Sequence, residues 1–235
     1  MSPIENIAGT KEHQAYLDKF AYIFAAEYLV RNERIPLPLG YNVSIDHYNH
    51  TFRKSEKVQH SISCQEITLR DDARQLLLTY RNVWAEPFFD LIRHSNGQVY
   101  FLCGADLTGF TLYSITKGEN HPFFSRCKID FRHCRQEALI FWYVTDVLYH
   151  PPTDLLILNG RDTMNCATAA LCDFSQPEAF PYRVANLSSF TWQTFDDASC
   201  HAVKWDEDHR LHLTLEERPD PVVVEAEVLQ ALLSE

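Results

Sequence analysis

The stretch FDLIRHSNGQVYFLCGAD, residues 89–106, decides the fold, because the chain contains three versions of it. TDVLYHPPTDLLILNGRD at 145–162 and HAVKWDEDHRLHLTLEER at 201–218 align with it without gaps, at a spacing of 56 residues. In each version an apolar strand, a polar turn and a second apolar strand follow one another, which indicates a β-hairpin. A module that recurs at a fixed spacing is typical of sheets that stack on their neighbours.

Equivalent positions carry related residues in these versions. Leu91, Val147 and Val203 occupy the same place in the first strand of each hairpin. Asp106 and Asp162 both follow the second strand, two residues after a glycine, and we interpret them as turn residues that accept backbone hydrogen bonds. The three segments are therefore interpreted as copies of one structural unit.

Units of this length that open with a hairpin are typical of the blades of a β-propeller. A fourth copy would begin near Glu33, but Pro36-Leu37-Pro38-Leu39 does not match the hairpin, and the chain has only 7 glycines for its many turns. We therefore predict a mainly β fold of antiparallel sheets in a propeller-like array, incomplete or irregular rather than a clean ring, with an N-terminal α-helix.

The N-terminal segment has the period of a helix. Thr10 is a suitable N-cap, and apolar residues between Tyr16 and Tyr28 recur at three- and four-residue steps. Pro36 and Pro38 would end any helix, and a period of two begins at Tyr41. We expect residues 1–40 to form the helix and a Pro-rich connector, and residues 41–235 to form a single β-rich domain with repeats of 56 residues.

Composition and charge exclude several classes of protein. With 46% hydrophobic residues the chain can bury a core, which excludes a disordered tail or a collagen-like repeat. The formal net charge of -11 repels phosphate backbones and anionic lipid, so we expect neither nucleic acid nor membrane as a partner. No phosphate-binding glycine loop is found, and we expect no cofactor. The oligomeric state is left open.

The 7 cysteines are odd in number, irregularly spaced and without a C-x-x-C pair, which is unlike a secreted disulfide framework. Residues 1–11 do not have the pattern of a signal peptide. We therefore expect a cytoplasmic protein with reduced thiols.

Three stretches, Val99–Ile115, Glu137–Pro151 and Leu155–Pro177, resemble a family of uncharacterised proteins. Its members carry DLYGYTVYDL-like, ETFIWTDVxYxP-like and GCYWACPY…DFSxP-like motifs in the same order. The resemblance implies propeller-like β repeats but no substrate. This chain departs from the family at 160–167, which reads GRDTMNCA, so that the first cysteine and the aromatic pair are replaced and Cys166 is the candidate for the second cysteine.

Candidate catalytic residues are few. Asp106, Asp146 and Asp162 with His150 could gather at one end of the strands and act as acid and base in a hydrolase. Cys166 is the best candidate for a reactive thiol, although only Arg161 is near enough in sequence to lower its pKa. For the aspartates we prefer the interpretation as turn residues.

A metal site is a further hypothesis. Cys127, His133 and Cys134 are residue types that bind zinc, but they need a turn between them to converge. We favour buried cysteines that pack as small apolar side chains and expect no metal.

The sequence therefore favours a non-catalytic binding or scaffold module that mediates protein interaction, with a hydrolase as the alternative. Aromatic residues are abundant, and most of them should lie in the core. Phe123-Phe124, and Trp84 beside Pro87, are candidates for an exposed surface that binds a protein partner. Whether the protein is an enzyme is left open.

Overall fold

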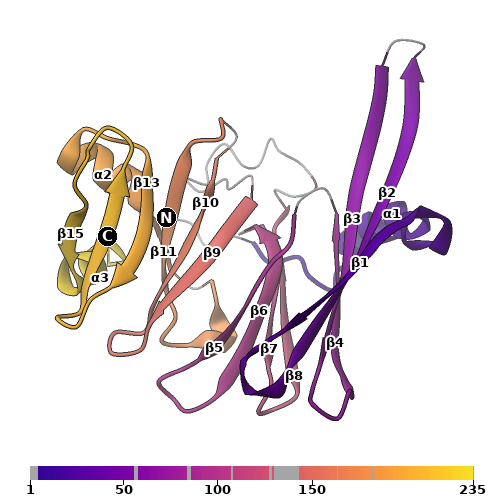
Figure 1. The fold of residues 1–235 in the computed structure, drawn as a ribbon, viewed down its shortest axis with the longest axis horizontal. Helices are drawn as coiled ribbons and strands as arrows, with labels where there is room; N and C mark the ends of the chain where they lie inside the picture. Colours follow the sequence, from indigo (N-terminus) through magenta and orange to yellow (C-terminus); the bar gives the residue numbers. More distant parts are fainter. Residues whose placement is uncertain are drawn as a thin grey trace.

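The computed structural model describes residues 5–55, 58–83, 86–106, 108–126, 129, 143–162, 164–181 and 183–234. Within these residues the strands form four antiparallel sheets, which lie one after another in chain order (Figure 1). Helix α1 (Lys11–Phe20) crosses one end of the stack. The prediction of a mainly β fold with antiparallel sheets and an N-terminal helix is confirmed.

Each sheet is a meander in which strands adjacent in sequence are paired. The first sheet contains β1 (Leu29–Pro36), β2 (Asn42–Ser55), β3 (Val58–Arg70) and β4 (Leu76–Val83). The second contains β5 (Phe88–Arg93), β6 (Val99–Asp106), β7 (Gly109–Ser114) and β8 (Glu119–Phe124). The third contains β9 (Tyr143–His150), β10 (Leu155–Arg161), β11 (Ala167–Asp173) and β12 (Val184–Asn186). The fourth contains β13 (Cys200–Trp205), β14 (Arg210–Leu215) and β15 (Val222–Glu225).

Short helices join and flank these sheets. They are the 3-10 turns η1 (Ala21–Phe24), η2 (Ala26–Tyr28), η3 (Pro38–Gly40) and η6 (Pro177–Ala179), and the α-helices α2 (Leu187–Phe195) and α3 (Ala226–Leu232).

The core lies between successive sheets, in three layers. Every residue from Tyr100 to Ala105 of β6 is buried, because side chains of alternate parity pack on the third and on the first sheet. Every residue from Leu155 to Gly160 of β10 is buried in the same way, between the second and fourth sheets. The apolar runs of these strands thus match sheets that are covered on both faces.

The second and third sheets pair equivalent residues of their first two strands only beyond a β-bulge, because their first turns differ in length. The turn of the second sheet spans 94–98, whereas that of the third spans only 151–154. A β-bulge between Asn159 and Gly160 compensates for the missing residue. Beyond this bulge, Gly160 pairs with its neighbour strand as Gly104 does, so the 56-residue spacing is restored.

The three repeat positions are not all alike. Leu91 packs on the first sheet and Val147 on the second, so each faces the sheet that precedes its own. Val203 is 45% exposed instead, because the register of β13 shifts between Ala202 and Lys204. The third copy is therefore irregular at its first strand.

Two expectations for the N-terminal part are wrong. The helix ends at Phe20 and does not run to Tyr28, because Ala25 adopts an extended conformation between two 3-10 turns that lead into β1. The stretch around Pro36 does form a hairpin, and strands begin at Leu29 rather than at Tyr41. Its turn uses positive φ angles at Leu39 and Gly40. Pro36 is tolerated because it lies on an edge strand.

Asn159 links the third sheet to the fourth through its side chain. The buried amide donates from Nδ2 to the carbonyl oxygen of Ala202 (2.7 Å) and to Oδ1 of Asp146 (2.6 Å). Its Oδ1 accepts from the backbone N–H of Ala202 (2.9 Å). These bonds satisfy backbone groups of β13 beside the register shift, where the regular strand pairing is interrupted.

Replacing Asn159 by leucine should therefore destabilise the protein by about 3 kcal/mol, because both backbone groups of Ala202 lose a buried partner. Urea unfolding of Asn159→Leu and of the wild type measures the difference. Gln193→Leu, an exposed change from an amide to leucine on α2, is the control. A loss below about 1 kcal/mol would show that the link contributes little.

Candidate functional site

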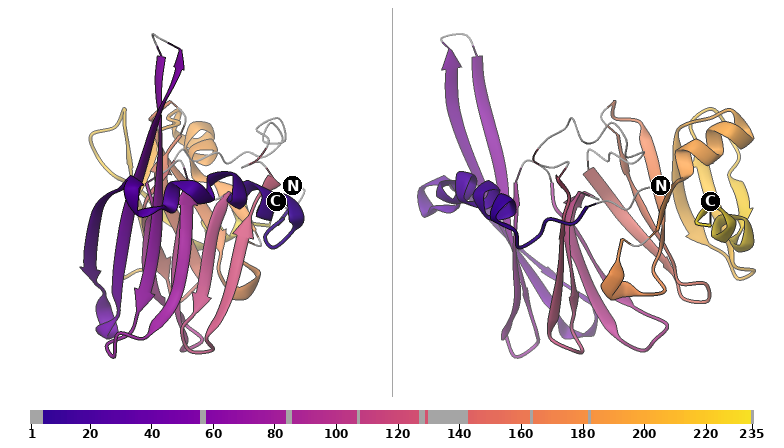
Figure 2. Two further views of the ribbon diagram at one scale, coloured as in Figure 1. Left: turned by 90° about the vertical axis from the view of Figure 1, so that its right-hand side faces the viewer. Right: turned by 180° about the vertical axis from the view of Figure 1, so that it is seen from behind.

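Helix α1 is held across the edges of the first two sheets (Figure 2). The backbone N–H of Ile7 donates to the carbonyl oxygen of Phe124 (2.8 Å), which attaches the preceding segment to β8. Thr10 caps the helix by accepting from the N–H of His13 (3.3 Å), as the sequence predicts. The helix therefore starts on the second sheet and runs toward the first.

A pocket of about 490 Å³ lies beneath this helix, between edge strand β4 and strands β7 and β8. We call it the helix-covered pocket. Side chains of α1 and η1 form its cover, and both sheets supply its walls. Phe123 and Phe124 line it and are themselves buried, so they do not form the exposed aromatic surface suggested as an alternative. Trp84 lies outside the described residues.

Both walls of the pocket carry uncharged polar side chains. Asn82 lines one wall and donates from Nδ2 to Oε1 of the buried Gln65 (3.0 Å). On the opposite wall, the hydroxyl of Thr111 donates to Oδ1 of Asn120. These groups can exchange hydrogen bonds with a polar ligand without burying a charge.

Two of the charged groups around the pocket, Arg81 and Glu66, neutralise each other. Arg81 donates from Nε to Oε2 of Glu66 (2.7 Å), and its guanidinium lies 4.6 Å from the ring centroid of Phe24. Asp18 accepts a hydrogen bond from the amide of Gln14 (2.8 Å). The described lining of the pocket thus offers no unpaired arginine or lysine to a negatively charged ligand group.

His13 lies at the aromatic end of the pocket. Its ring centroid is 4.4 Å from that of Phe124, and its Nδ1 accepts from the backbone N–H of Gly9 (3.1 Å). Burial lowers the pKa of His13, which keeps the ring neutral at pH 7. Tyr16 packs on the same phenylalanine, 5.0 Å between centroids. An aromatic group of a ligand would fit this end by ring packing.

The structure does not gather the sequence-predicted catalytic residues. Strand β10 runs from Leu155, which pairs with His150, to Arg161, so Asp162 and His150 lie at opposite ends of the sheet. They are separated by roughly 20 Å of extended strand. Asp146 lies between them on β9. Asp106 ends β6, and its side chain is outside the described part of the structure.

Asp162 organises a turn. Its Oδ1 accepts from the backbone N–H groups of Met164 (2.8 Å) and Cys166 (3.0 Å), which agrees with the preferred interpretation as a turn residue. Cys166 is exposed there. Asp146 accepts from the side chains of Asn159 (2.6 Å) and Thr145 (2.9 Å), which gives it a structural role between sheets.

The proposed metal ligands Cys127, His133 and Cys134 all lie outside the described residues. Within the described ranges no group of three or more metal-ligating side chains gathers. None of the helices in those ranges is both long and apolar enough to cross a membrane.

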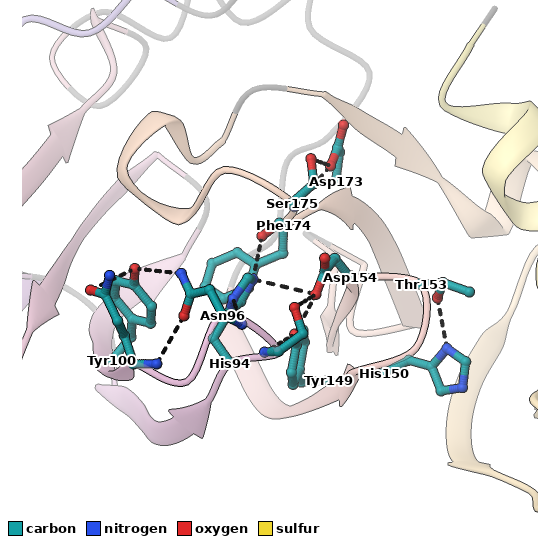
Figure 3. Close-up of polar contacts among 12 residues, drawn as sticks. His94, Asn96, Tyr100, Tyr149, His150, Thr153, Asp154, Asp173, Phe174 and Ser175 are labelled. Carbon is teal, nitrogen blue, oxygen red and sulfur yellow. Dashed lines mark hydrogen bonds and ion pairs between the residues drawn. The ribbon is translucent and has the colours of Figure 1, made fainter.

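The sequence analysis did not identify a polar cluster at the opposite end of the second and third sheets (Figure 3). The buried His94 accepts at Nδ1 from the N–H of Asn96 (3.1 Å), so its Nε2 carries the proton and donates to the carbonyl of Phe174 (2.9 Å). Asp154 accepts from the hydroxyls of Tyr149 (2.6 Å) and Ser95 (2.6 Å). Because both nitrogens of His94 bond to the backbone, this cluster joins the two hairpin turns and holds no free base.

The cluster belongs to a contact that repeats along the stack. The ring of His94 stacks on Tyr149 (centroids 5.4 Å apart, 22° between planes), and that of His150 stacks on Trp205 (4.1 Å, 18°). Both histidines and both partner rings are 56 residues apart. The repeat could have identified this pair of contacts, because the two histidines occupy the same position of the 56-residue repeat.

Comparison with known proteins returns no match: no family model, curated protein or solved structure matches the chain. The resemblance to the family of uncharacterised proteins therefore stays a prediction.

The polar cluster should lower the free energy of unfolding as the pH becomes alkaline. Burial and the hydrogen bond to Asp154 raise the pKa of Tyr149 to about 12. An unfolded chain ionises tyrosine near pH ~10, so the stabilisation is complete below that pH and is lost as the pH rises toward 12. Between pH 9 and pH 11, the free energy of unfolding should fall less for the Tyr149→Phe variant than for the wild type. Urea unfolding at both values tests this, and equal losses in the two proteins would contradict it.

Proposed function

We propose that the protein is a non-catalytic binding module that mediates protein interaction, and that a side chain of its partner enters the helix-covered pocket. The observation that carries this proposal is the pocket itself, whose walls come from both sheets and whose cover is α1. A volume of about 490 Å³ is within the range of ~300–1,000 Å³ that is typical of binding pockets. It suits one or two side chains of a docked segment.

A propeller-like array supports this function. Successive sheets of similar build pack face to face, as blades do. The outward face of the fourth sheet carries polar groups such as His212 and Thr214, and that of the first carries Asp46 and Glu66. These polar groups, together with the cover of α1 and η1 on part of the first sheet, favour an open array over a ring completed by another chain. Such an array leaves its edges and covering helix available for binding.

The side chains of the pocket favour binding over catalysis. Arg81 and Glu66 pair with each other, and His13 is neutral with its Nδ1 engaged. Amide groups at Asn82 and Asn120 and the rings around Phe124 match an uncharged partner group that combines an aromatic surface with a hydrogen-bonding atom. A tyrosine, tryptophan or glutamine side chain has this chemistry.

A random-peptide display library tests the proposal. Peptides selected on the wild-type protein should share one such anchor residue, and Leu17→Trp should weaken their binding at least about tenfold, equivalent to 1.4 kcal/mol. Leu17 is half-buried on α1 and lines the pocket, so the larger ring would occupy the space that the anchor needs.

Ala15→Trp is the matched control, because it adds the same ring to an exposed position of α1 that does not line the pocket. It should leave peptide binding within about twofold. Selection of no peptide, or of peptides that bind Leu17→Trp as well as Ala15→Trp, would refute the role of the pocket.

A further inference from the structure

Strands β2 and β3 extend beyond the body of the molecule as a two-stranded ribbon (Figure 1). The pairing of β1 with β2 ends at Tyr48, and that of β4 with β3 begins at Cys64. Beyond these residues the two strands pair with each other, and within the described part of the chain no further strand pairs with either of them. We call residues 49–52 and 60–63 the ribbon. Each of its strands presents an open edge to which another strand can hydrogen-bond.

The two faces of the ribbon differ in chemistry. On one face Ser61 donates to Oδ1 of Asn49 (2.7 Å), and the hydroxyl of Thr51 donates to the same atom (3.2 Å). These polar groups satisfy one another across the strands. That face therefore stabilises the ribbon and offers few unpaired groups to a partner.

The other face is a row of aromatic rings. Phe52 lies between His50 and His60 at centroid distances of 5.9 and 5.7 Å, with 21° between planes in both contacts. The row continues through Tyr28 and Tyr22, whose ring centroids lie 4.8 and 5.3 Å from that of His50. Phe52 is 38% exposed and Tyr22 is 48% exposed. We call this row the aromatic face.

The charge of the segment that joins the two strands is opposite to that of the chain. Between Phe52 and His60 the sequence contains Arg53, Lys54 and Lys57 against Glu56 alone, whereas the whole chain has a formal net charge of -11. Basic residues that adjoin the ribbon in the sequence favour an acidic partner.

From these features we infer that the ribbon binds an extended, acidic segment of a partner protein, which adds as a further strand along its open edge. Main-chain hydrogen bonds would provide affinity, and alternate side chains of the segment would contact the aromatic face. Pairing with the ribbon of a second copy fits less well, because two basic segments would repel each other. The acidic body likewise disfavours a nucleic acid.

The ribbon adjoins the helix-covered pocket without depending on it. Tyr22 of η1 belongs to the aromatic face, and Phe24 of the same turn lines the pocket. One partner could contact both surfaces, but strand addition to the ribbon requires no occupant of the pocket.

Three synthetic eight-residue peptides test the inference by fluorescence anisotropy: alternating Val-Glu, alternating Val-Lys, and Val-Glu with alternate backbone nitrogens methylated. The wild type should bind the first peptide, and the other two at least about tenfold more weakly. The double variant Arg53→Glu/Lys54→Glu should also bind the acidic peptide at least about tenfold more weakly than the wild type does. Raised salt should likewise weaken binding of this peptide to the wild type, because it screens the attraction between the charges. Lys11→Glu/Lys204→Glu is the matched control, because it makes the same change of charge at exposed sites elsewhere, and should leave affinity within about twofold.

The Phe52→Ser variant tests the aromatic face separately and should bind the acidic peptide more weakly than the wild type does. Its melting curve checks that it still folds. The Leu17→Trp variant should bind the acidic peptide as tightly as the wild type does. The proposal for the pocket and the inference for the ribbon can therefore fail independently of each other. Equal affinity for the acidic and basic peptides, or binding that the charge reversal at Arg53 and Lys54 leaves unchanged, would overturn the inference. Self-association of the wild type that Phe52→Ser abolishes would also overturn it, because a second copy would then be the occupant.

Discussion

Burial of both faces of the two inner sheets is the constraint on which the rest of the structure depends. Tyr100 and Phe101 are neighbours in β6, yet each is fully buried against a different sheet. A sheet that is apolar on both sides is stable only when something covers each side, so the second and third sheets require neighbours. The first and fourth sheets provide them, and their outward faces can then be polar. At the hairpin ends, the stacks of His94 on Tyr149 and of His150 on Trp205 align one sheet with the next.

Much of this architecture could be predicted from the sequence, because the hairpins are local and their period is regular. Features that arise from contacts between distant segments could not. The pocket exists because α1 crosses two sheet edges, and no spacing of residues in the sequence encodes that crossing. The bulge after Asn159 and the strand that ends at Pro36 were missed for a related reason: sheet pairing can accommodate one irregular residue when tertiary contacts determine the register.

The candidate catalytic residues show how a repeat can mislead. Asp162 is prominent in the sequence because it recurs beside a glycine, but its carboxylate is occupied by two backbone N–H groups of its own turn. A residue that recurs from one copy to the next is one that builds the repeated unit, and its polar groups are already hydrogen-bonded within that unit. The surfaces that we propose for binding, the helix-covered pocket and the ribbon, both use residues near η1, which has no equivalent in the described parts of the later sheets. Function is thus expected where the repeat is interrupted.

The cover that α1 and η1 give to the first sheet has a consequence during synthesis. Phe20 and Ile23 pack on the outward side of that sheet, against Tyr48 and Cys64. Both are made before the strands that they protect, so part of one side of the earliest sheet can be shielded as soon as it leaves the ribosome. Each later sheet then has a finished surface to fold upon, and the growing chain needs to hide only its newest face from other nascent proteins.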